Sequence, residues 1–349
     1  MFRSFSISII VLLFTYGISY SDFPIGIYGV DNAEDIAIVK KAGFNCIQTY
    51  KSDPAIIKKL AAEAKNQDIK LLIYPYNIIN SKYEKEADNY PILAWYLYDE
   101  PDIWKVSREK LTSLDEKSKK IFPNHKTAFV IGQGKTETPY YDIADILMVD
   151  WYPIPHLALE SFGQNIALAK QGLKIIGRDN TPLWAVIQMF DWKEYKQHRS
   201  DDNRIGRFPS KDEIRFMSYD AVFNGATGLF YFIYTSRGIP LPKSKPEQWK
   251  DIVDIIQEIS FTSDVFDKGI EIQNIIDIEK PLKAKSFDYQ GTKYIFLINP
   301  TSKFQSMPAI FFKSNFDLIY ETDINLKKTI SNGKSNFPPY HVFVFKYIK

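Results

Sequence analysis

The sequence predicts an α/β fold in which a (β/α)8 TIM barrel is followed by a small antiparallel β-sandwich domain. Strand-like and helix-like segments alternate between about residues 23 and 262, with eight strands in that span, which is the usual size of such a barrel. Beyond Thr262 the alternation gives way to short segments with strand periodicity. The length of 349 residues accommodates one large and one small domain.

The eight expected barrel strands are short apolar runs, as buried parallel strands usually are. They span residues 23–29, 44–50, 69–76, 92–100, 126–132, 146–153, 183–190 and 229–234. Helices with apolar residues at helical spacing are expected at 33–42, 54–66, 106–121, 162–176, 211–224 and 247–259. A doubly wound sheet would need a glycine-rich phosphate turn after its first strand. The segment Gly26–Asp31 lacks that spacing, so the barrel is preferred.

The C-terminal segment has the pattern of an antiparallel β-domain. Its expected strands are 284–289, 293–298, 309–312, 318–321 and 341–347. Turn signals separate them at Gln290-Gly291 and Asn332-Gly333. We therefore expect a barrel over residues 22–262 and a β-sandwich over 263–349.

The first 21 residues have the pattern of a cleavable signal peptide. Arg3 precedes a short apolar run over residues 7–16, and Ser19-Tyr20-Ser21 offers small residues for cleavage. The run is short for a transmembrane span, so we expect a secreted or periplasmic protein without a membrane span in its mature form. A retained anchor is the alternative. Cys46 is the single cysteine and excludes an intramolecular disulfide, so we expect it to be an inert core residue.

The composition excludes several classes of partner and chemistry. A net charge of +2 without a basic stripe argues against a nucleic-acid surface, and we expect a monomer. The four histidines lie in separate loops without metal-ligand spacing, and no G-x-S-x-G motif occurs. We therefore expect neither a metal nor another cofactor.

The C-terminal ends of the barrel strands are expected to meet at one mouth, where barrels carry their active sites. Aromatic, amide and carboxylate side chains gather at these positions, which suits the binding of a carbohydrate. The candidate binding residues are Tyr28, Tyr50, Tyr76, Asp99, Trp151, Tyr152, Gln188, Trp192 and Tyr234.

Two carboxylates at the mouth are candidate catalytic residues, Glu100 after the fourth strand and Asp150 after the sixth. Glycoside hydrolysis needs such a pair, one acid and one base or nucleophile. Successive residues of a regular strand face opposite sides, so Asp99 and Glu100 cannot both be regular interior residues. Glu100 has the longer side chain and is preferred as the proton donor, while Asp99 holds a substrate hydroxyl or braces a neighbour. A structural role in the turn after the sixth strand remains the alternative for Asp150.

The segment Trp95–Asp102 resembles the fourth-strand motif of clan A glycoside hydrolase barrels, in which an Asn/Asp-Glu-Pro sequence carries the acid/base glutamate. Further segments, in the same order, are similar to bacterial glycosidase-like proteins with an appended β-sandwich. They are residues 146–153, 183–190, 215–221, 225–232 and 297–301. The resemblance implies an exported glycoside hydrolase that cleaves O-glycosidic bonds of an oligo- or polysaccharide, with Glu100 as general acid/base.

Gln188 departs from this pattern, because clan A enzymes place a nucleophilic glutamate at the end of the seventh strand. Asp150 is the first replacement to consider, with Glu194 and Glu213 behind it, although Glu213 suits the first turn of a helix. The alternative is a non-catalytic carbohydrate-binding barrel that has lost its nucleophile. A structural surface protein, whose barrel supports the β-domain, is a third interpretation. If Asp150 activates a water, we expect inversion and a separation between the Glu100 and Asp150 carboxyls of roughly 6.5–9.5 Å.

Overall fold

The barrel is closed and parallel, with its eight strands in chain order. The computed structural model describes residues 23–194, 205–273, 276, 278–312, 315–320 and 336–348. Around the barrel the strands are β1 (Ile25–Ile27), β2 (Cys46–Gln48), β3 (Lys70–Ile73), β4 (Ile92–Asp99), β5 (Thr127–Ile131), β6 (Ile146–Asp150), β7 (Leu183–Gln188) and β8 (Gly228–Phe232). β1 pairs with both β2 and β8, which closes the ring. The predicted barrel is confirmed.

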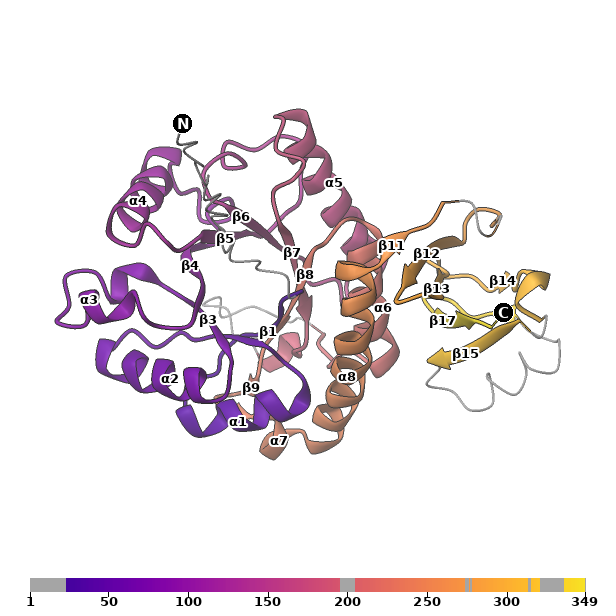
Figure 1. The fold of residues 1–349 in the computed structure, drawn as a ribbon, viewed down its shortest axis with the longest axis horizontal. Coiled ribbons are helices and arrows are strands. Elements are labelled where there is room, and N and C mark those ends of the chain that lie inside the picture. The colour runs from indigo at the N-terminus through magenta and orange to yellow at the C-terminus, as the bar shows by residue number, and fades with distance from the viewer. Residues whose placement is uncertain are drawn as a thin grey trace, which may run out of the picture.

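Helices cover the outside of the barrel (Figure 1). They are α1 (Ala33–Ala42), α2 (Pro54–Asn66), α3 (Glu84–Ala87), α4 (Arg108–Ile121), α5 (Ser161–Ile175), α6 (Lys211–Phe223), α7 (Leu241–Ser244) and α8 (Pro246–Lys268). The third connection, which has poor periodicity, contains a 3₁₀ turn (Pro75–Asn77) and the short α3. β5 runs to β6 without a helix. α8 continues past the expected helix end at residue 259 and past the expected domain boundary at 262.

Two apolar layers follow from the alternation of side chains along each strand. One layer fills the space between strands and helices, with Ile27, Leu97 and Ile187 among its members. The other fills the barrel interior and includes Tyr28, Tyr96 and Met148. Cys46 is buried within this interior layer, as expected.

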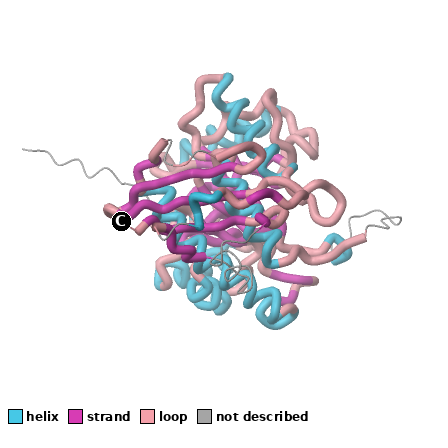
Figure 2. The backbone as a smooth tube through the Cα atoms, turned by 90° about the vertical axis from the view of Figure 1, so that its right-hand side faces the viewer, coloured by secondary structure: helices cyan, strands magenta, loops and turns pink. Residues whose placement is uncertain are grey.

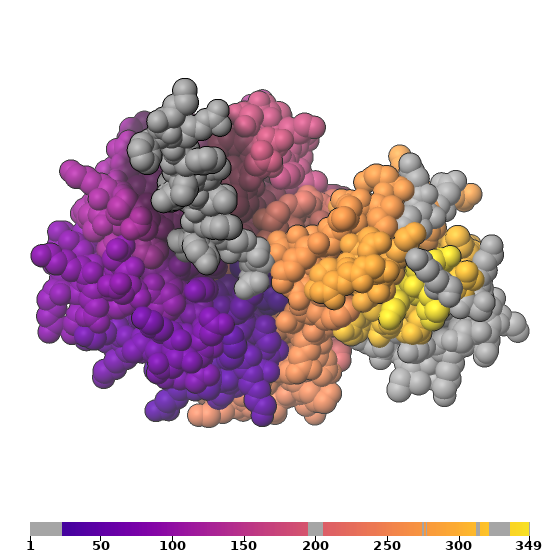
Figure 3. Space-filling view, in the orientation of Figure 1, coloured from indigo at the N-terminus to yellow at the C-terminus, as the bar shows by residue number. Residues whose placement is uncertain are grey.

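The C-terminal segment forms an antiparallel β-domain beside the barrel. Its five-stranded sheet has the order β11-β12-β13-β17-β15, with a two-stranded sheet β14-β16. Their bounds are β11 (Ile270–Glu271), β12 (Lys283–Tyr289), β13 (Thr292–Ile298), β14 (Gln305–Ser306), β15 (Phe316–Tyr320), β16 (Asn336–Phe337) and β17 (Val342–Tyr347). Figure 2 views the molecule from the side of this domain, and Figure 3 shows it as a separate lobe.

Two expectations about this domain have different outcomes. Gln290 and Gly291 have φ of 54° and 75° and join β12 to β13, so the predicted turn is confirmed. The expected strand at 309–312 is wrong, because this run is a single 3₁₀ turn, Ala309–Phe312. The Phe311 amide donates to the Pro308 carbonyl, and the Phe311 ring stacks on Phe345 with 4.4 Å between centroids. Asn332-Gly333 lies outside the described residues.

A buried arginine joins the barrel wall to the β-domain. Arg215 on α6 forms a bidentate ion pair with Glu258 on α8, through contacts of 2.8 and 2.9 Å. Its Nη1 donates to the Val342 carbonyl oxygen of β17 at 2.6 Å. Tyr219, one turn along α6, donates its hydroxyl to Glu258 at 2.6 Å. One guanidinium therefore holds two helices of the barrel and one strand of the β-domain.

The expected signal peptide, residues 1–21, lies outside the described residues. Within the parts of the chain that the structure describes, no helix is long and apolar enough to cross a bilayer.

We predict that Glu258→Ala lowers the free energy of unfolding by about 3–5 kcal/mol, because it leaves the Arg215 charge buried without its carboxylate. Asp264→Ala on the same helix is the matched control, since it removes only an exposed ion pair with Lys268 and costs at most about 1 kcal/mol. Urea denaturation followed by circular dichroism measures both. Equal losses in the two variants would show that the buried pair is not a main support of this junction.

Candidate active site

An irregularity in β4 brings two successive carboxylates to the mouth of the barrel. Tyr96 lies opposite Ala128 of β5, whereas Asp99 lies opposite Val130, so β4 contains one residue more than its partner over this stretch. Such a bulge shifts the alternation of side chains. Asp99 therefore accepts a hydrogen bond from the interior Tyr96 hydroxyl at 2.7 Å. The expectation that Asp99 and Glu100 cannot both be regular interior residues concerned a regular strand, and the bulge is the irregularity that changes this geometry.

Glu100 adopts a left-handed backbone conformation, with φ of 51°. Its amide still donates to the Val130 carbonyl at 3.1 Å, so the turn begins directly at the end of the sheet. The Glu100 carbonyl then accepts hydrogen bonds from the amides of Ile103 and Trp104. This tight turn directs the Glu100 side chain to the end of β6, where its carboxyl is hydrogen-bonded to that of Asp150.

The loop after β4 is tied to the end of β5 by Asp102. Its two carboxylate oxygens accept hydrogen bonds from the amides of Gly132 and Gln133, at 2.9 and 3.1 Å. A Cβ at Gly132 would lie 2.5 Å from Ile103 Cγ1 and 3.1 Å from Glu100 Oε1, so glycine gives this turn its space. Sequence reasoning missed both supports. The signal for them was an aspartate and a glycine directly after neighbouring strands.

Asp150 ends β6 with a buried carboxyl that is only 6% exposed. Its Oδ2 accepts a hydrogen bond from the Tyr152 hydroxyl at 3.2 Å. Its Oδ1 receives none from the N–H and hydroxyl donors of the described residues, which leaves the Glu100 carboxyl as the polar group in contact with this side chain.

Burial and neighbouring negative charge raise the pKa of both carboxyls, while the hydrogen bond to Asp150 partly lowers that of Glu100. Burial, and next the negative charge of Asp99, raise the pKa of Glu100 to about 7. Burial and the neighbouring Glu100 charge raise the pKa of Asp150 well above its ordinary range. Like charges this close oppose one another's ionisation, so the pair binds a proton more readily than isolated carboxyls do. A carboxylic acid that is protonated at neutral pH can act as a general acid.

The contact between the carboxyls contradicts the wide separation that we expected for an inverting enzyme. The expectation assumed that the short aspartate side chain would leave a gap across the mouth. The bulge and the left-handed turn instead carry the longer Glu100 side chain to Asp150.

Aromatic rings form a continuous arc around the carboxyl pair. Neighbouring members have ring centroids 4.9–6.5 Å apart. The arc consists of Tyr76, Tyr74, Tyr50, Tyr96, Tyr28, Phe232, Tyr152, Phe190 and Trp192. Tyr28 and Tyr96 are buried, whereas Tyr50 is 37% and Tyr76 is 50% exposed. Five of the predicted aromatic residues thus lie together: Tyr28, Tyr50, Tyr76, Tyr152 and Trp192.

Two predicted binding residues are not brought to this arc. Trp151 alternates to the helix side of β6, and its Nε1 donates to the Ser161 hydroxyl at 2.9 Å. Tyr234 follows the end of β8, where strand alternation no longer applies. Its hydroxyl donates to Asp35 on α1 at 3.1 Å, and its ring packs on Trp249.

Gln188 lies at the end of β7 and is fully buried. Its Oε1 accepts from the Ile154 amide at 2.9 Å, and its Nε2 donates to the Ile154 and Phe190 carbonyls. These hydrogen bonds hold the loop after β6 and use most of the hydrogen-bonding capacity of the Gln188 amide, so little remains for a ligand. The structure places Gln188 beside the site as a support of its backbone.

The other carboxylates considered from the sequence are committed to local contacts. Glu194 accepts from the Ser236 hydroxyl and pairs with Lys245 at 2.9 Å. Glu213 completes a capping box with Ser210 at the start of α6, as its position in a first helical turn predicted. Across the described ranges, no three His, Cys, Asp or Glu side chains are placed to hold a metal ion.

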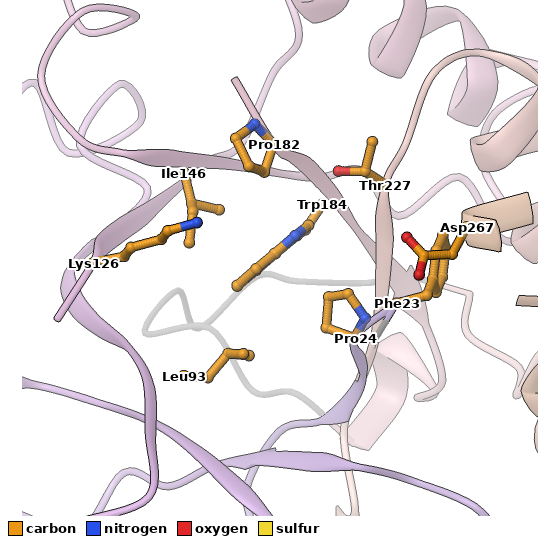
Figure 4. Close-up of a pocket in the computed structure, with 9 residues that line it drawn as sticks. All are labelled: Phe23, Pro24, Leu93, Lys126, Ile146, Pro182, Trp184, Thr227 and Asp267. Atoms are coloured by element: carbon orange, nitrogen blue, oxygen red, sulfur yellow. The ribbon is translucent and has the colours of Figure 1, made fainter. Parts of the chain in front are cut away.

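A separate cavity of about 170 Å³ lies at the opposite end of the barrel (Figure 4). Except for Asp267 on α8, its lining residues precede or begin the barrel strands. They are mostly apolar, with Trp184 at the centre of the view. The N-terminal face of a barrel serves stability, so this cavity is not the candidate active site.

The fold is similar to solved structures of glycoside hydrolases. A family 5 glycoside hydrolase from Bacteroides vulgatus matches with a TM-score of 0.58 and 11% identity, over 94% of this chain and 89% of that chain. A structure described as a glycoside hydrolase matches with a TM-score of 0.56 and 12% identity, over 94% and 92%. An α-amylase from Geobacillus thermoleovorans, complexed with acarbose, gives 0.50 and 10%, over 95% and 99%.

At these identities the likeness concerns the fold. No protein-family model matches the chain, and no curated protein matches it. The predicted resemblance to the barrels of clan A-like glycoside hydrolases is confirmed at this level.

We predict that Glu100→Gln makes the protein more resistant to heat than the wild type at pH 8 but not at pH 4. The folded pKa of about 7 exceeds the ordinary value of 4.5. Between these values the folded protein binds a proton that the unfolded chain has released, so the wild type loses stability as pH rises through this window. Melting temperatures across pH 4–8 measure the difference between the variants. A difference that stays constant with pH would contradict the raised pKa.

Proposed function

We propose that the protein is a glycoside hydrolase that cleaves O-glycosidic bonds of an oligo- or polysaccharide. The observation that carries the proposal is the buried, hydrogen-bonded pair of Glu100 and Asp150 at the C-terminal ends of β4 and β6. Active sites of such barrels lie at this face. The similarity of the fold to glycoside hydrolases supports the same reading.

Glu100 is the proton donor in this proposal. Its carboxyl is partly accessible while that of Asp150 is buried, so Glu100 can reach the glycosidic oxygen of a sugar bound at the mouth. The proton of the pair passes to Glu100 along their hydrogen bond, and Asp150 remains as the carboxylate. The exposed faces of Tyr50 and Tyr76 provide apolar surfaces on which the C–H faces of a sugar ring can pack.

Export to the periplasm or the medium belongs to the same proposal. It rests on the charged, apolar and small-residue pattern of residues 1–21. A polysaccharide outside the cell is the substrate that such a location supplies.

A second candidate function is carbohydrate binding without catalysis. Gln188 favours it, because the glutamate that clan A barrels use as nucleophile is replaced by an amide with a structural role. The raised pKa of the Glu100–Asp150 pair favours the enzyme, since a binding site gains nothing from two buried carboxyls that repel one another.

We predict that Glu100→Gln lowers turnover of natural glycans by about 10²–10⁴-fold, which is the usual contribution of a general acid. Aryl glycosides with good leaving groups lose less in the bond-breaking step, because their departure needs less protonation. Glu116→Gln, at an exposed position of α4, is the matched control and keeps wild-type activity. The measurement is release of reducing ends and of aryl alcohol from a panel of glycans and aryl glycosides.

The same panel separates the two candidate functions. Glycan binding without turnover by the wild type, unchanged in Glu100→Gln, would replace the hydrolase by the binding protein. If the wild type shows no binding and no turnover on any glycan, both candidate functions are refuted.

A further inference from the structure

We infer that a cavity between the loops after β4 and β5 binds the sugar unit that departs as the leaving group, and that this unit is uncharged. The inference rests on the proposed function and deepens it, because it names the part of the substrate that Glu100 releases by protonation. It follows from the place of the cavity beside Glu100, from the hydrogen bonds that hold its walls and from the charges of its lining.

The cavity adjoins the proposed proton donor. It has a volume of about 340 Å³ and is lined by residues of the two loops, and ligand sites typically have volumes of about 300–1,000 Å³. Asp102 lines it and accepts a hydrogen bond from the Gly132 amide at 2.9 Å. A Cβ built on Gly132 would lie 3.1 Å from Glu100 Oε1. The Glu100 carboxyl therefore lies close to the wall of the cavity.

The cavity and the aromatic arc occupy different sides of the mouth. In the described part of the chain, the rings of the arc come from β4, β8 and the loops after β1, β2, β3, β6 and β7, and none comes from β5 or the loop after it. A general acid lies beside the oxygen that joins the two sugars it separates. If the sugar that is cleaved at C1 packs on the arc, the leaving group extends from Glu100 into the cavity.

Hydrogen bonds within the protein hold the walls of the cavity in place. The Tyr140 hydroxyl donates to the Val106 carbonyl at 2.6 Å, which ties the loop after β5 to the loop after β4. The Gly134 amide donates to Asn165 Oδ1 on α5 at 3.0 Å, and Asp102 holds the amides at the start of the same loop. A preformed site needs less ordering when a ligand binds.

The polar lining suits an uncharged ligand with many hydroxyls. It combines two ammonium groups and two carboxylates, whose formal charges cancel, with an amide and a hydroxyl that both donate and accept. No ion pair joins these charges to one another within the described ranges. Sugar hydroxyls can use donors and acceptors alike, whereas an ionic ligand would gain one pair of charges and be repelled by the other. The side chains concerned are Lys105, Lys135, Asp102, Glu137, Gln133 and Thr138.

The first experiment compares two substrates that share the sugar cleaved at C1. One is the aryl glycoside, whose leaving group is not a sugar, and the other is the oligosaccharide with a sugar as leaving group, both chosen from those that the wild type hydrolyses. Lys135→Met keeps the length of the side chain and removes its ammonium group. We expect the ratio of kcat/KM for the oligosaccharide to kcat/KM for the aryl glycoside to fall about tenfold, as for the loss of a hydrogen bond to a charged group.

Lys117→Met, at an exposed position of α4, is the matched control and keeps the wild-type ratio. Melting temperatures establish that both variants are folded. The ratio is informative because damage to the catalytic residues, or to the barrel as a whole, would lower both rates and leave the ratio unchanged.

The second experiment uses the wild type alone and therefore does not depend on the folding of a variant. It compares oligosaccharides whose leaving-group sugar is either a hexose or the uronic acid of the same configuration. We expect kcat/KM to be at least about tenfold higher for the hexose, because the carboxylate of the uronic acid meets Asp102 and Glu137 and loses hydration on entering the cavity.

The outcomes separate this inference from the proposed function. An unchanged ratio in Lys135→Met, or a uronic acid leaving group that is cleaved as fast as the hexose, overturns the inference and leaves a glycoside hydrolase. Turnover of aryl glycosides without turnover of any oligosaccharide has the same consequence. Absence of turnover on all glycosides overturns the proposed function together with the inference.

Discussion

The bulge near the end of β4 is the constraint on which the candidate site depends. A regular strand would send Asp99 and Glu100 to opposite faces of the sheet. The added residue and the left-handed turn at Glu100 place both carboxylates at one opening. This backbone geometry costs conformational energy. The hydrogen bond that Asp102 accepts from the Gly132 amide stabilises the turn, and the absence of a side chain at Gly132 gives it space. The position of the proton donor is thus a property of the backbone and of its neighbours on β5.

Local patterns in the sequence were sufficient to predict the architecture. The apolar runs of Ile92–Tyr98 and Leu183–Gln188, bounded by proline and polar residues, determine buried strands because few other structures can bury them. The turn at Gln290-Gly291 was predictable because glycine readily adopts the positive φ that such a turn needs. The 3₁₀ turn at Ala309–Phe312 was not predictable in this way, because a four-residue apolar run has no periodicity to distinguish a strand from a turn.

The sequence predicted where the candidate site lies in the barrel, but not how its side chains contact one another. Strand ends identified Glu100 and Asp150 as neighbours at one mouth, but their contact depends on a register shift between β4 and β5 that single-sequence patterns do not encode. Trp151 and Tyr234 were assigned to the mouth by position alone. A side chain can be assigned to the inside or outside of the barrel only while the strand continues. β8 ends at Phe232, two residues before Tyr234, whose side chain points to Asp35 on α1. The role of Gln188 is set by a distant loop at Ile154.

The hydrogen bond from Arg215 to Val342 makes completion of the barrel wall depend on the last part of the chain to be synthesised. During translation, α6 and α8 emerge together with their ion pair, while the acceptor on β17 is still absent. A buried donor that lacks its acceptor costs about 1–3 kcal/mol. A chain that ends before β17 therefore contains every residue of the candidate site and yet lacks one acceptor of the guanidinium that joins α6 to α8.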